Sequence, residues 1–411
     1  MLKSFWIPLQ KLSTDEKKNL IFLTLAYFFS LMSYPIIRSS SDAFFLQTHG
    51  VKNWPWVTFY SVIVLSICIF LFSKVQAKIG VKKLYALVSF FSVAFFLCSA
   101  FALKADIAIF SYATYIWKEC YIVILLHLCL AFFNTHFSYD FAKSFFGPFG
   151  AVTSIGPIIG GAFTSFFTKE IGVFWLVIVG ALICLLTPLA FLMLSERTGT
   201  ERKERPQENP LASVRDIWPY VATIVGIIMV TQFIINVANF KFNFVVQNNF
   251  AAIEDKTTFF GKIYTLINIL TLVIQLVVTP IALRSMSLRA NHFSIVGLHL
   301  LVFLPLLILG GQVVWAVSAV FICAKGLDYS LFGVAKEMLY YPLKEYQKYG
   351  AKYIVDMVMY RFSKGLVSLS LTQVQNFRAL DALISVAVLI WGALVFYVFR
   401  LHGRLKRSSE R

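Results

Sequence analysis

Long apolar runs separated by short polar segments are the main pattern of this sequence. Reading the runs against charged and turn-forming residues gives twelve candidate spans of about 20 residues, the length that an α-helix needs to cross a bilayer. They lie at 19–37, 54–73, 84–103, 117–137, 145–168, 172–194, 216–240, 258–282, 292–310, 312–333, 353–374 and 381–400. We therefore predict an all-α integral membrane protein with about twelve transmembrane helices.

The longest polar interruption falls in the middle of the chain and predicts the domain organisation. We expect an N-terminal six-helix bundle at 1–194 and a charged cytoplasmic linker at 195–215. A C-terminal six-helix bundle follows at 216–400, and a basic cytoplasmic tail at 401–411.

Lysine and arginine gather in every second loop. One set of loops carries clusters at 74–83, 197–215, 284–289 and 336–352, and both termini share this property, whereas the opposite loops carry isolated cations. Cytoplasmic loops of membrane proteins are enriched in these residues, so we expect both termini in the cytoplasm and an even number of spans.

Composition agrees with a membrane protein. Hydrophobic residues make up 59 % of the chain and charged residues only 14 %, whereas soluble domains carry about a quarter charged residues. Topology and attraction to anionic lipid account for the net charge of +17, so the lipid bilayer is an expected partner and nucleic acid is not. The six cysteines are scattered and are expected to be core residues.

Charged residues inside the predicted spans are the candidates for function. Each costs about 2.5 to 3.5 kcal/mol at the bilayer centre, so those that remain usually face a partner or a water-filled path. Some have a structural alternative, since Asp356 could pair with Arg361 and Lys241 could reach a headgroup. As a set, cations from both halves would form an anion site. The positions are Arg38, Asp42, Glu119, Lys241, Lys325, Asp328, Asp356, Arg361 and Lys364.

Glycines punctuate the fifth span. Gly156 and Gly160 are four residues apart, a spacing that lets helix backbones approach closely, and Pro157 can bend the helix. Tight packing and a gating role remain open as explanations.

No catalytic or metal-binding constellation is present in the sequence. His127 and His136 share roughly one helix face, but no carboxylate or cysteine completes a ligand set. We expect no enzyme activity, no metal and no cofactor.

Several segments together resemble one known family. They are Tyr34 to Asp42, Glu119, Phe132 to Asn134, Ala142 to Phe146, Tyr329 to Phe332 followed by Lys336, and Asp356, Arg361, Lys364, Ser368 and Gln373. In these residues the chain resembles the bacterial and plastid nucleotide transporters, the ATP/ADP translocases.

The resemblance implies a major-facilitator-like fold of two six-helix bundles, alternating access, and exchange of a nucleotide or related anionic metabolite across a bacterial inner membrane. The substrate-binding residues implied are Arg38, Arg361, Lys364, Lys336 and Asn239. The coupling or gating residues implied are Asp42, Glu119, Lys143 and Asp356.

The chain departs from the family at charged positions. Ser41 stands where the family has a lysine, and Asn239 and Asn243 stand where it has a glutamate and a lysine. A less charged cargo fits these changes, as does a proton-coupled carrier of a non-nucleotide metabolite that uses Glu119 or Asp42. A binding or lipid-handling protein on the same fold is the third alternative, and the oligomeric state stays open.

Overall fold

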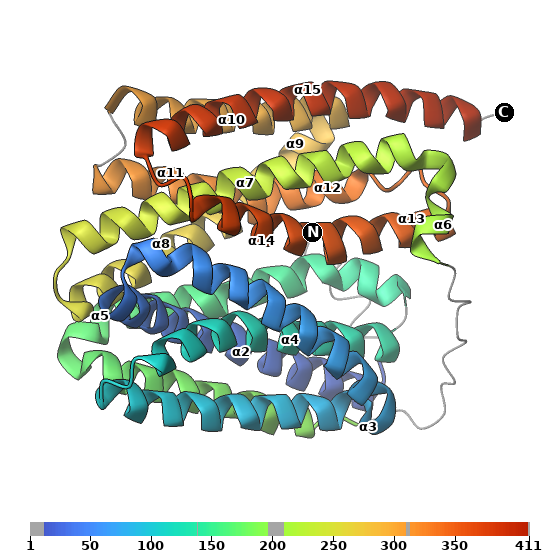
Figure 1. The fold of residues 1–411 in the computed structure, drawn as a ribbon. Coiled ribbons are helices and arrows are strands. Elements are labelled where there is room, and N and C mark those ends of the chain that lie inside the picture. The colour runs from blue at the N-terminus through green and yellow to red at the C-terminus, as the bar shows by residue number, and fades with distance from the viewer. Residues whose placement is uncertain (1–11, 138, 196–208, 310–312, 410–411) are drawn as a thin grey trace. The chain divides into compact units, whose positions relative to one another are not determined.

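The computed structural model describes residues 12–137, 139–195, 209–309 and 313–409, apart from the side chains at 139, 140, 142–153, 304–309 and 406–409. All regular elements in these residues are helices (Figure 1). The first half contains α2 (Thr14–His49), η1 (Val51–Asn53), α3 (Trp54–Lys104), α4 (Ile109–His136) and α5 (Tyr139–Leu192).

The second half begins with two short elements before the long helix α7. It contains α6 (Pro210–Ser213), η2 (Arg215–Ile217), α7 (Trp218–Asn249), α8 (Ile253–Val273), η3 (Ile274–Val278), α9 (Thr279–Ser285) and α10 (Leu288–Leu309). It ends with α11 (Val314–Leu327), η4 (Asp328–Phe332), α12 (Gly333–Met338), α13 (Glu345–Lys352), η5 (Tyr353–Met359), α14 (Tyr360–Leu371) and α15 (Phe377–Ser409).

Two glycines divide helices that otherwise run on. Gly80 in α3 and Gly172 in α5 have φ values of 81° and 80°, a left-handed conformation that glycine adopts without steric cost. Each therefore joins two spans. With this division, α2 to α5 make six passes. In the second half α7, α8 to α9, α10, α11 to α12, α13 to α14, and α15 make six more among the described residues.

The predicted spans are shorter than the helices, most clearly at two places. α2 continues beyond 37 to His49 and α7 continues beyond 240 to Asn249. The cations that ended the apolar runs, Arg38 and Lys241, lie inside these helices because ion pairs with Asp42 and Asp381 neutralise them there.

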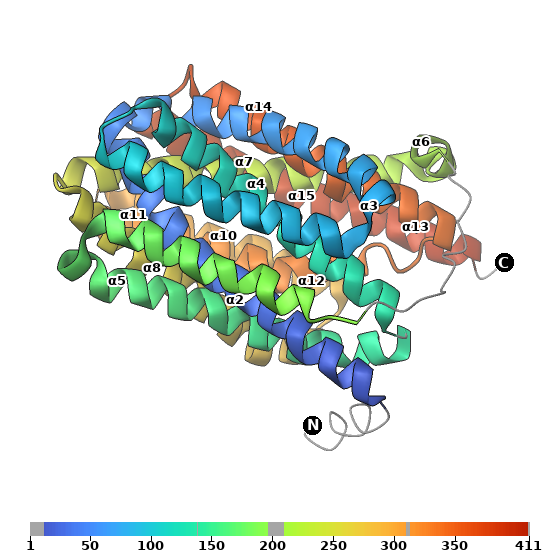
Figure 2. The ribbon, with the colours of Figure 1, turned by 90° about the horizontal axis from the view of Figure 1, so that it is seen from below.

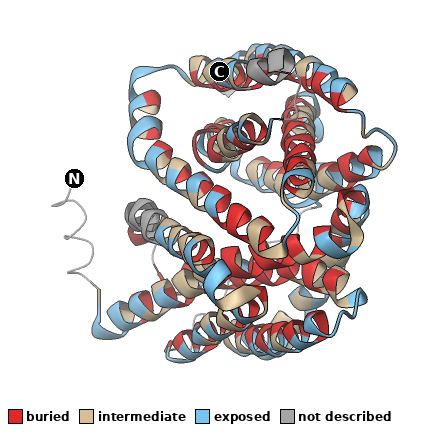
Figure 3. Ribbon diagram, turned by 90° about the vertical axis from the view of Figure 1, so that its left-hand side faces the viewer, coloured by how far each residue is buried: buried red, intermediate tan, exposed pale blue. Residues whose placement is uncertain are grey.

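Apolar side chains cover the outside of the helices as well as the inside. Phe166, Leu301 and Leu389 are each more than 60 % exposed, and buried faces turn towards neighbouring helices while exposed faces turn away (Figure 3). Helices with this composition are long and apolar enough to cross a membrane. The prediction of an all-α, many-span membrane protein is confirmed.

Contacts group the chain into two compact units, each described by itself. The first, called the N-terminal unit, contains Met1–Gly50, Ile63–Glu201 and Phe250–Ile269. The second, called the C-terminal unit, contains Val51–Val62, Arg202–Asn249 and Leu270–Arg411. Most of α8 thus packs with helices from the first half of the sequence. The predicted boundaries around a linker at 195–215 stay a prediction, since residues 196–208 lie outside the described part.

Within the N-terminal unit, α2 and α5 form an extensive contact (Figure 2). A Cβ atom on Gly156 would lie 2.7 Å from the carbonyl oxygen of Phe28, and one on Gly160 would overlap the carbonyl oxygen of Met32. On the next position, a Cβ on Gly161 would lie 3.2 Å from the backbone of Gly261 in α8. Close backbone packing therefore explains these glycines, and the gating role stays a prediction.

Candidate functional site

The N-terminal unit holds a buried charged cluster centred on Asp42. Arg38 and Asp42 lie four residues apart and share a face of α2, with 3.7 Å between Arg38 Nε and Asp42 Oδ2. From α4, Lys118 Nζ lies 2.6 Å from Asp42 Oδ1. From α8, the hydroxyl of Tyr264 donates a hydrogen bond of 2.7 Å to Asp42 Oδ2. Three helices are thereby joined through one carboxylate, which is 4 % exposed.

Aromatic rings complete the surroundings of the two cations. The Arg38 guanidinium lies over the rings of Tyr264 and Tyr34, 4.1 and 5.6 Å from their centroids. The Lys118 ammonium lies 3.5 Å from the centroid of Tyr115. Cation–π contacts of this kind strengthen when the cation is desolvated, so the rings stabilise charges that would otherwise be costly to bury.

The charges of this cluster balance. Glu119 adds a second carboxylate, 3.4 Å from the Lys118 ammonium, so two cations face two anions. The structure therefore brings together Arg38, Asp42 and Glu119, three of the residues that the sequence singled out.

In the C-terminal unit, Lys336 and Asp356 form an ion pair. Lys336 Nζ on α12 lies 2.6 Å from Asp356 Oδ1 on η5, and the hydroxyl of Tyr340 donates to the same oxygen at 3.5 Å. A second pair, between Lys352 and Glu337, lies beside it with 2.6 Å between Nζ and Oε2. Asp356 therefore pairs with Lys336 and not with Arg361, the partner that the sequence suggested.

A buried ion pair joins α7 to α15. Lys241 is fully buried and its ammonium binds the carboxylate of Asp381. The ammonium also lies 5.1 Å from the centroid of the Phe377 ring. The alternative in which Lys241 extends to a lipid headgroup is therefore wrong, because the lysine has an anionic partner inside the helix bundle.

Arg361 differs from the other predicted cations. Its Nη1 donates a hydrogen bond of 3.3 Å to the carbonyl oxygen of Met357, one turn earlier in its own helix. Among the described residues it has no carboxylate partner. Lys364 follows on the same helix, partly buried.

Asn239 and Lys143 are the remaining predicted site residues. Asn239 accepts a hydrogen bond of 3.1 Å from the side-chain amide of Asn243, so these two asparagines contact each other on α7. Lys143 lies on α5, but its side chain is outside the described part of the structure.

Three partners in these clusters, Lys118, Asp381 and Tyr264, were not predicted from the sequence. Lys118 and Asp381 are ionisable residues inside apolar helices, and the rule that identified their neighbours would have identified them too. Tyr264 gave no such signal, because a tyrosine in a predicted span is unremarkable until its neighbours in space are known. Among the described residues no group of three or more histidine, cysteine, aspartate or glutamate side chains could hold a metal ion.

Sequence comparison finds no relatives: no known family profile matches the chain and no curated protein matches it. Comparison of structures finds many. The nucleoside transporter NupG superposes with a TM-score of 0.66 at 13 % identity, over 93 % of this chain and 98 % of its own. An auto-inhibited peptide transporter of the POT family superposes with a TM-score of 0.64 at 12 % identity, over 96 % and 97 %.

A third similar structure is the bacterial homologue of the human lysosomal transporter Spinster, captured inward-facing and unoccupied. Its TM-score is 0.60 at 12 % identity, over 94 % of this chain and 97 % of its own. Such low identities establish the architecture alone. The chain has an all-α, major-facilitator-like membrane fold.

Proposed function

We propose that this protein is a secondary transporter that moves a small organic solute across the membrane by alternating access. The observation that carries the proposal is the likeness in fold to solved transporters, which extends over nearly the whole of both chains. Buried, paired charges inside apolar bundles support it, since ionisable residues kept at membrane depth usually belong to a transport path. An enzyme on this fold would need a catalytic set that the charged clusters do not supply.

We further infer that the cargo is an organic anion of low charge. Arg38 is opposed by Asp42 and Lys336 by Asp356, so two of the predicted anion-binding cations are already neutralised. Arg361 has no described carboxylate partner and is the cation best placed to bind a single carboxylate or phosphate, with a planar fork that matches such groups.

Exchange of ATP for ADP is the second candidate, and the resemblance in helices 1, 10 and 11 favours it. A triphosphate needs several cations to replace its hydration. This candidate therefore requires Asp42 and Asp356 to release Arg38 and Lys336 when the nucleotide binds.

Purified protein in lipid vesicles tests both candidates by counterflow, in which labelled solute enters vesicles preloaded with the unlabelled compound. The panel contains ATP, ADP, AMP, GTP, NAD and simple monocarboxylates and dicarboxylates. We expect counterflow of a singly or doubly charged anion. Counterflow of ATP and ADP alone would favour the nucleotide candidate, and none with any compound would contradict the proposal.

The Arg361→Ala variant tests whether Arg361 binds the cargo. A lost charge-assisted hydrogen bond is worth about 1.5 to 3 kcal/mol, so the apparent affinity should fall about tenfold to a hundredfold. Arg361→Lys should lose less. Arg378→Ala is the matched control, because Arg378 is an exposed arginine on α15 and should transport normally. A binding or lipid-handling protein predicts no difference between the Arg361→Ala and Arg378→Ala variants.

A further inference from the structure

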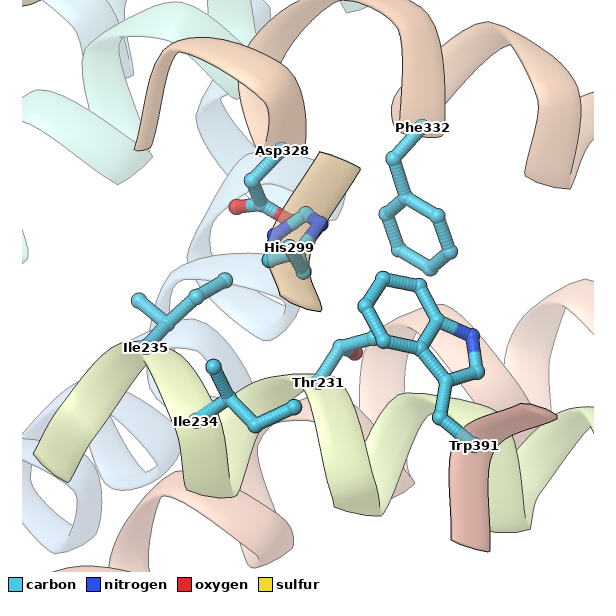
Figure 4. A pocket seen from close by; sticks show the side chains of 7 residues that line it. All are labelled: Thr231, Ile234, Ile235, His299, Asp328, Phe332 and Trp391. Atoms are coloured by element: carbon cyan, nitrogen blue, oxygen red, sulfur yellow. The ribbon is translucent and has the colours of Figure 1, made fainter. Parts of the chain in front are cut away.

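A small pocket lies within the C-terminal unit, and none of the residues of the ion pairs described above lines it. Four helical elements line it: α7 contributes Thr231, Ile234 and Ile235, α10 contributes His299, η4 contributes Asp328 and Phe332, and α15 contributes Trp391 (Figure 4). Its side chains leave no free space as large as a water molecule, whereas typical small-molecule sites hold roughly 300 to 1,000 Å³. It is too small for most organic solutes, and its walls are mainly apolar.

Asp328 differs from the carboxylates of the ion pairs described above. Among the described residues it has no basic partner. Asp42 has Lys118, Asp356 has Lys336 and Asp381 has Lys241, whereas no described residue forms an ion pair or hydrogen bond with the Asp328 carboxylate. It stands near the middle of the Val314–Met338 span. A bare carboxylate at this depth is costly, so it needs a proton or a bound cation.

The basic groups around Asp328 are engaged elsewhere. On its own helix Lys325 donates to the hydroxyl of Tyr329 at 3.3 Å, and Lys336 pairs with Asp356; both cations act on Asp328 only through space. On α10, the Nε2 atom of His292 lies 3.2 Å from the carbonyl oxygen of Ala335.

The other packed elements bring no charge. α7 and α15 contribute Thr231, Ile234, Ile235 and Trp391 to the pocket. Gln275 on η3 does not line the pocket, and its amide donates to the carbonyl oxygen of Tyr329 at 3.1 Å. His299 is therefore the one titratable neighbour that lines the pocket with Asp328.

His299 is oriented by its own helix. Its Nδ1 lies 2.8 Å from the carbonyl oxygen of Ile295. A carbonyl only accepts, so Nδ1 carries the proton and the neutral ring keeps Nε2 as an acceptor. His299 is 3 % exposed, and no described residue bonds to Nε2. The pocket thus combines an acid without a partner and a buried base.

The local backbone at Asp328 is also unusual. Residues Asp328 to Phe332 form a π-helix, a rare one-turn widening that occurs frequently at functional sites. The wide turn presents Asp328 and Phe332 to the same pocket, and the Gln275 amide satisfies the Tyr329 carbonyl oxygen within it.

We propose that Asp328 is the proton-binding site through which transport is coupled to a proton gradient, with His299 as its positioning neighbour. An O–H bond forms on the carboxylate with a proton taken from water on one side of the membrane, and the same bond breaks to release the proton to water on the other. The proposal rests on the proposed transport function. A metal cation is a poorer occupant, because Na⁺- or Ca²⁺-type sites need many oxygen ligands and the walls here are Ile234, Ile235, Phe332 and Trp391.

Infrared spectroscopy of the protein in lipid films tests the proposal without any cargo. A protonated carboxyl group gives a C=O stretching band separate from those of ionised carboxylates. We expect wild-type protein to show this band at low pH and to lose it as the pH rises, and Asp328→Asn to lack it. The double variant Lys241→Met with Asp381→Asn is the matched control and should keep the band, because it removes a carboxylate that already has a cation.

Other results would overturn the proposal. These are absence of a titrating band in the wild type, persistence of the band in Asp328→Asn, and loss of the band on adding Na⁺ at constant pH. If Asp328→Asn does not fold, Asp328→Glu decides the matter, because the band should then change in frequency and titration midpoint. His299→Gln should shift the titration midpoint of the Asp328 band without removing it.

Transport measurements on the Asp328→Asn variant provide a second test. Asp328→Asn should lose accumulation driven by a pH gradient, to the level of protein-free vesicles, while keeping counterflow of the same solute. Equal gradient-driven accumulation in variant and wild type would contradict the coupling role. Absence of counterflow in every form would contradict the proposed function and leave the infrared result standing by itself.

Discussion

At the scale of single residues, the unusual feature of this protein is how completely some of its charges are buried. Lys118 is 1 % exposed and lies between the carboxylate of Asp42 and the ring of Tyr115. Removing one member of such a group leaves the other charge without compensation in a region of low polarity. That loss usually costs more than the pair contributes, because water no longer solvates the remaining ion.

Replacing Lys118 with methionine should therefore destabilise the protein strongly. We expect a loss of about 3 to 5 kcal/mol, seen as a lower melting temperature of the purified protein in detergent. The double variant Lys118→Met with Asp42→Asn should recover much of it, because one cation and one anion are then removed together and the cluster stays neutral, with Arg38 and Glu119 as its remaining charges. Lys169→Met is the control: its pair with Asp255 is exposed and should cost less than about 1 kcal/mol. Equal effects of Lys118→Met and Lys169→Met would contradict the assignment.

Individual charged residues could be recognised from the sequence, but their partners could not. Arg38, Asp42 and Asp356 stand out because charge inside an apolar run is costly. The pairing of Asp356 with Lys336 depends on how α12 and η5 pack, and no spacing along the chain encodes it. Tyr264 donates to a carboxylate 222 residues away, so only the folded arrangement reveals it.

At the scale of elements, close helix contacts depend on glycine. α2 crosses α5 so tightly that the carbonyl oxygen of Met32 occupies the space where a side chain on Gly160 would begin. Backbone atoms cannot move aside as a flexible side chain can. The contact therefore tolerates no added methyl group without separating the two helices.

Gly160→Ala should lower the melting temperature, with a cost of about 1 to 3 kcal/mol for overpacking. Gly297→Ala is the matched control on α10, where nothing lies within 4 Å of the added Cβ atom. Alanine favours a helix over glycine by up to about 1 kcal/mol, so that variant should melt at the same temperature or higher. A Gly160→Ala protein as stable as wild type would show that α2 and α5 can separate freely.

The positions of helices followed from the apolar runs, whereas the helix ends did not. Hydropathy stops the first span at 37, just before Arg38, and the seventh at 240, just before Lys241. Both helices continue because Asp42 and Asp381 neutralise these cations. The three π-helical turns, η3, η4 and η5, could not be predicted from the pattern of apolar residues either, because each shifts the helical register by a single residue.

At the scale of the whole molecule, the alternation of basic and non-basic loops predicts the orientation in the membrane. Residues 105–108 connect α3 to α4 on the side predicted to face away from the cytoplasm, and Arg404 lies near the other end of the chain on the predicted cytoplasmic side.

Cysteine labelling of the full chain tests the orientation. A membrane-impermeant maleimide added to intact cells should label Ile107→Cys, which replaces an exposed loop residue, and should label Arg404→Cys only after the cells are opened. Unmodified protein measures the background from the native cysteines. The reverse pattern would show that the protein inserts in the opposite orientation.

The grouping of Phe250–Ile269 with the N-terminal unit has a consequence for biogenesis. The ribosome delivers Asp42 to the membrane long before it delivers Tyr264, and 222 residues separate them. The first six spans therefore enter the bilayer with one hydrogen-bond partner of Asp42 missing and without the α8 backbone that packs against Gly161. Completion of that half is delayed until the eighth span is inserted.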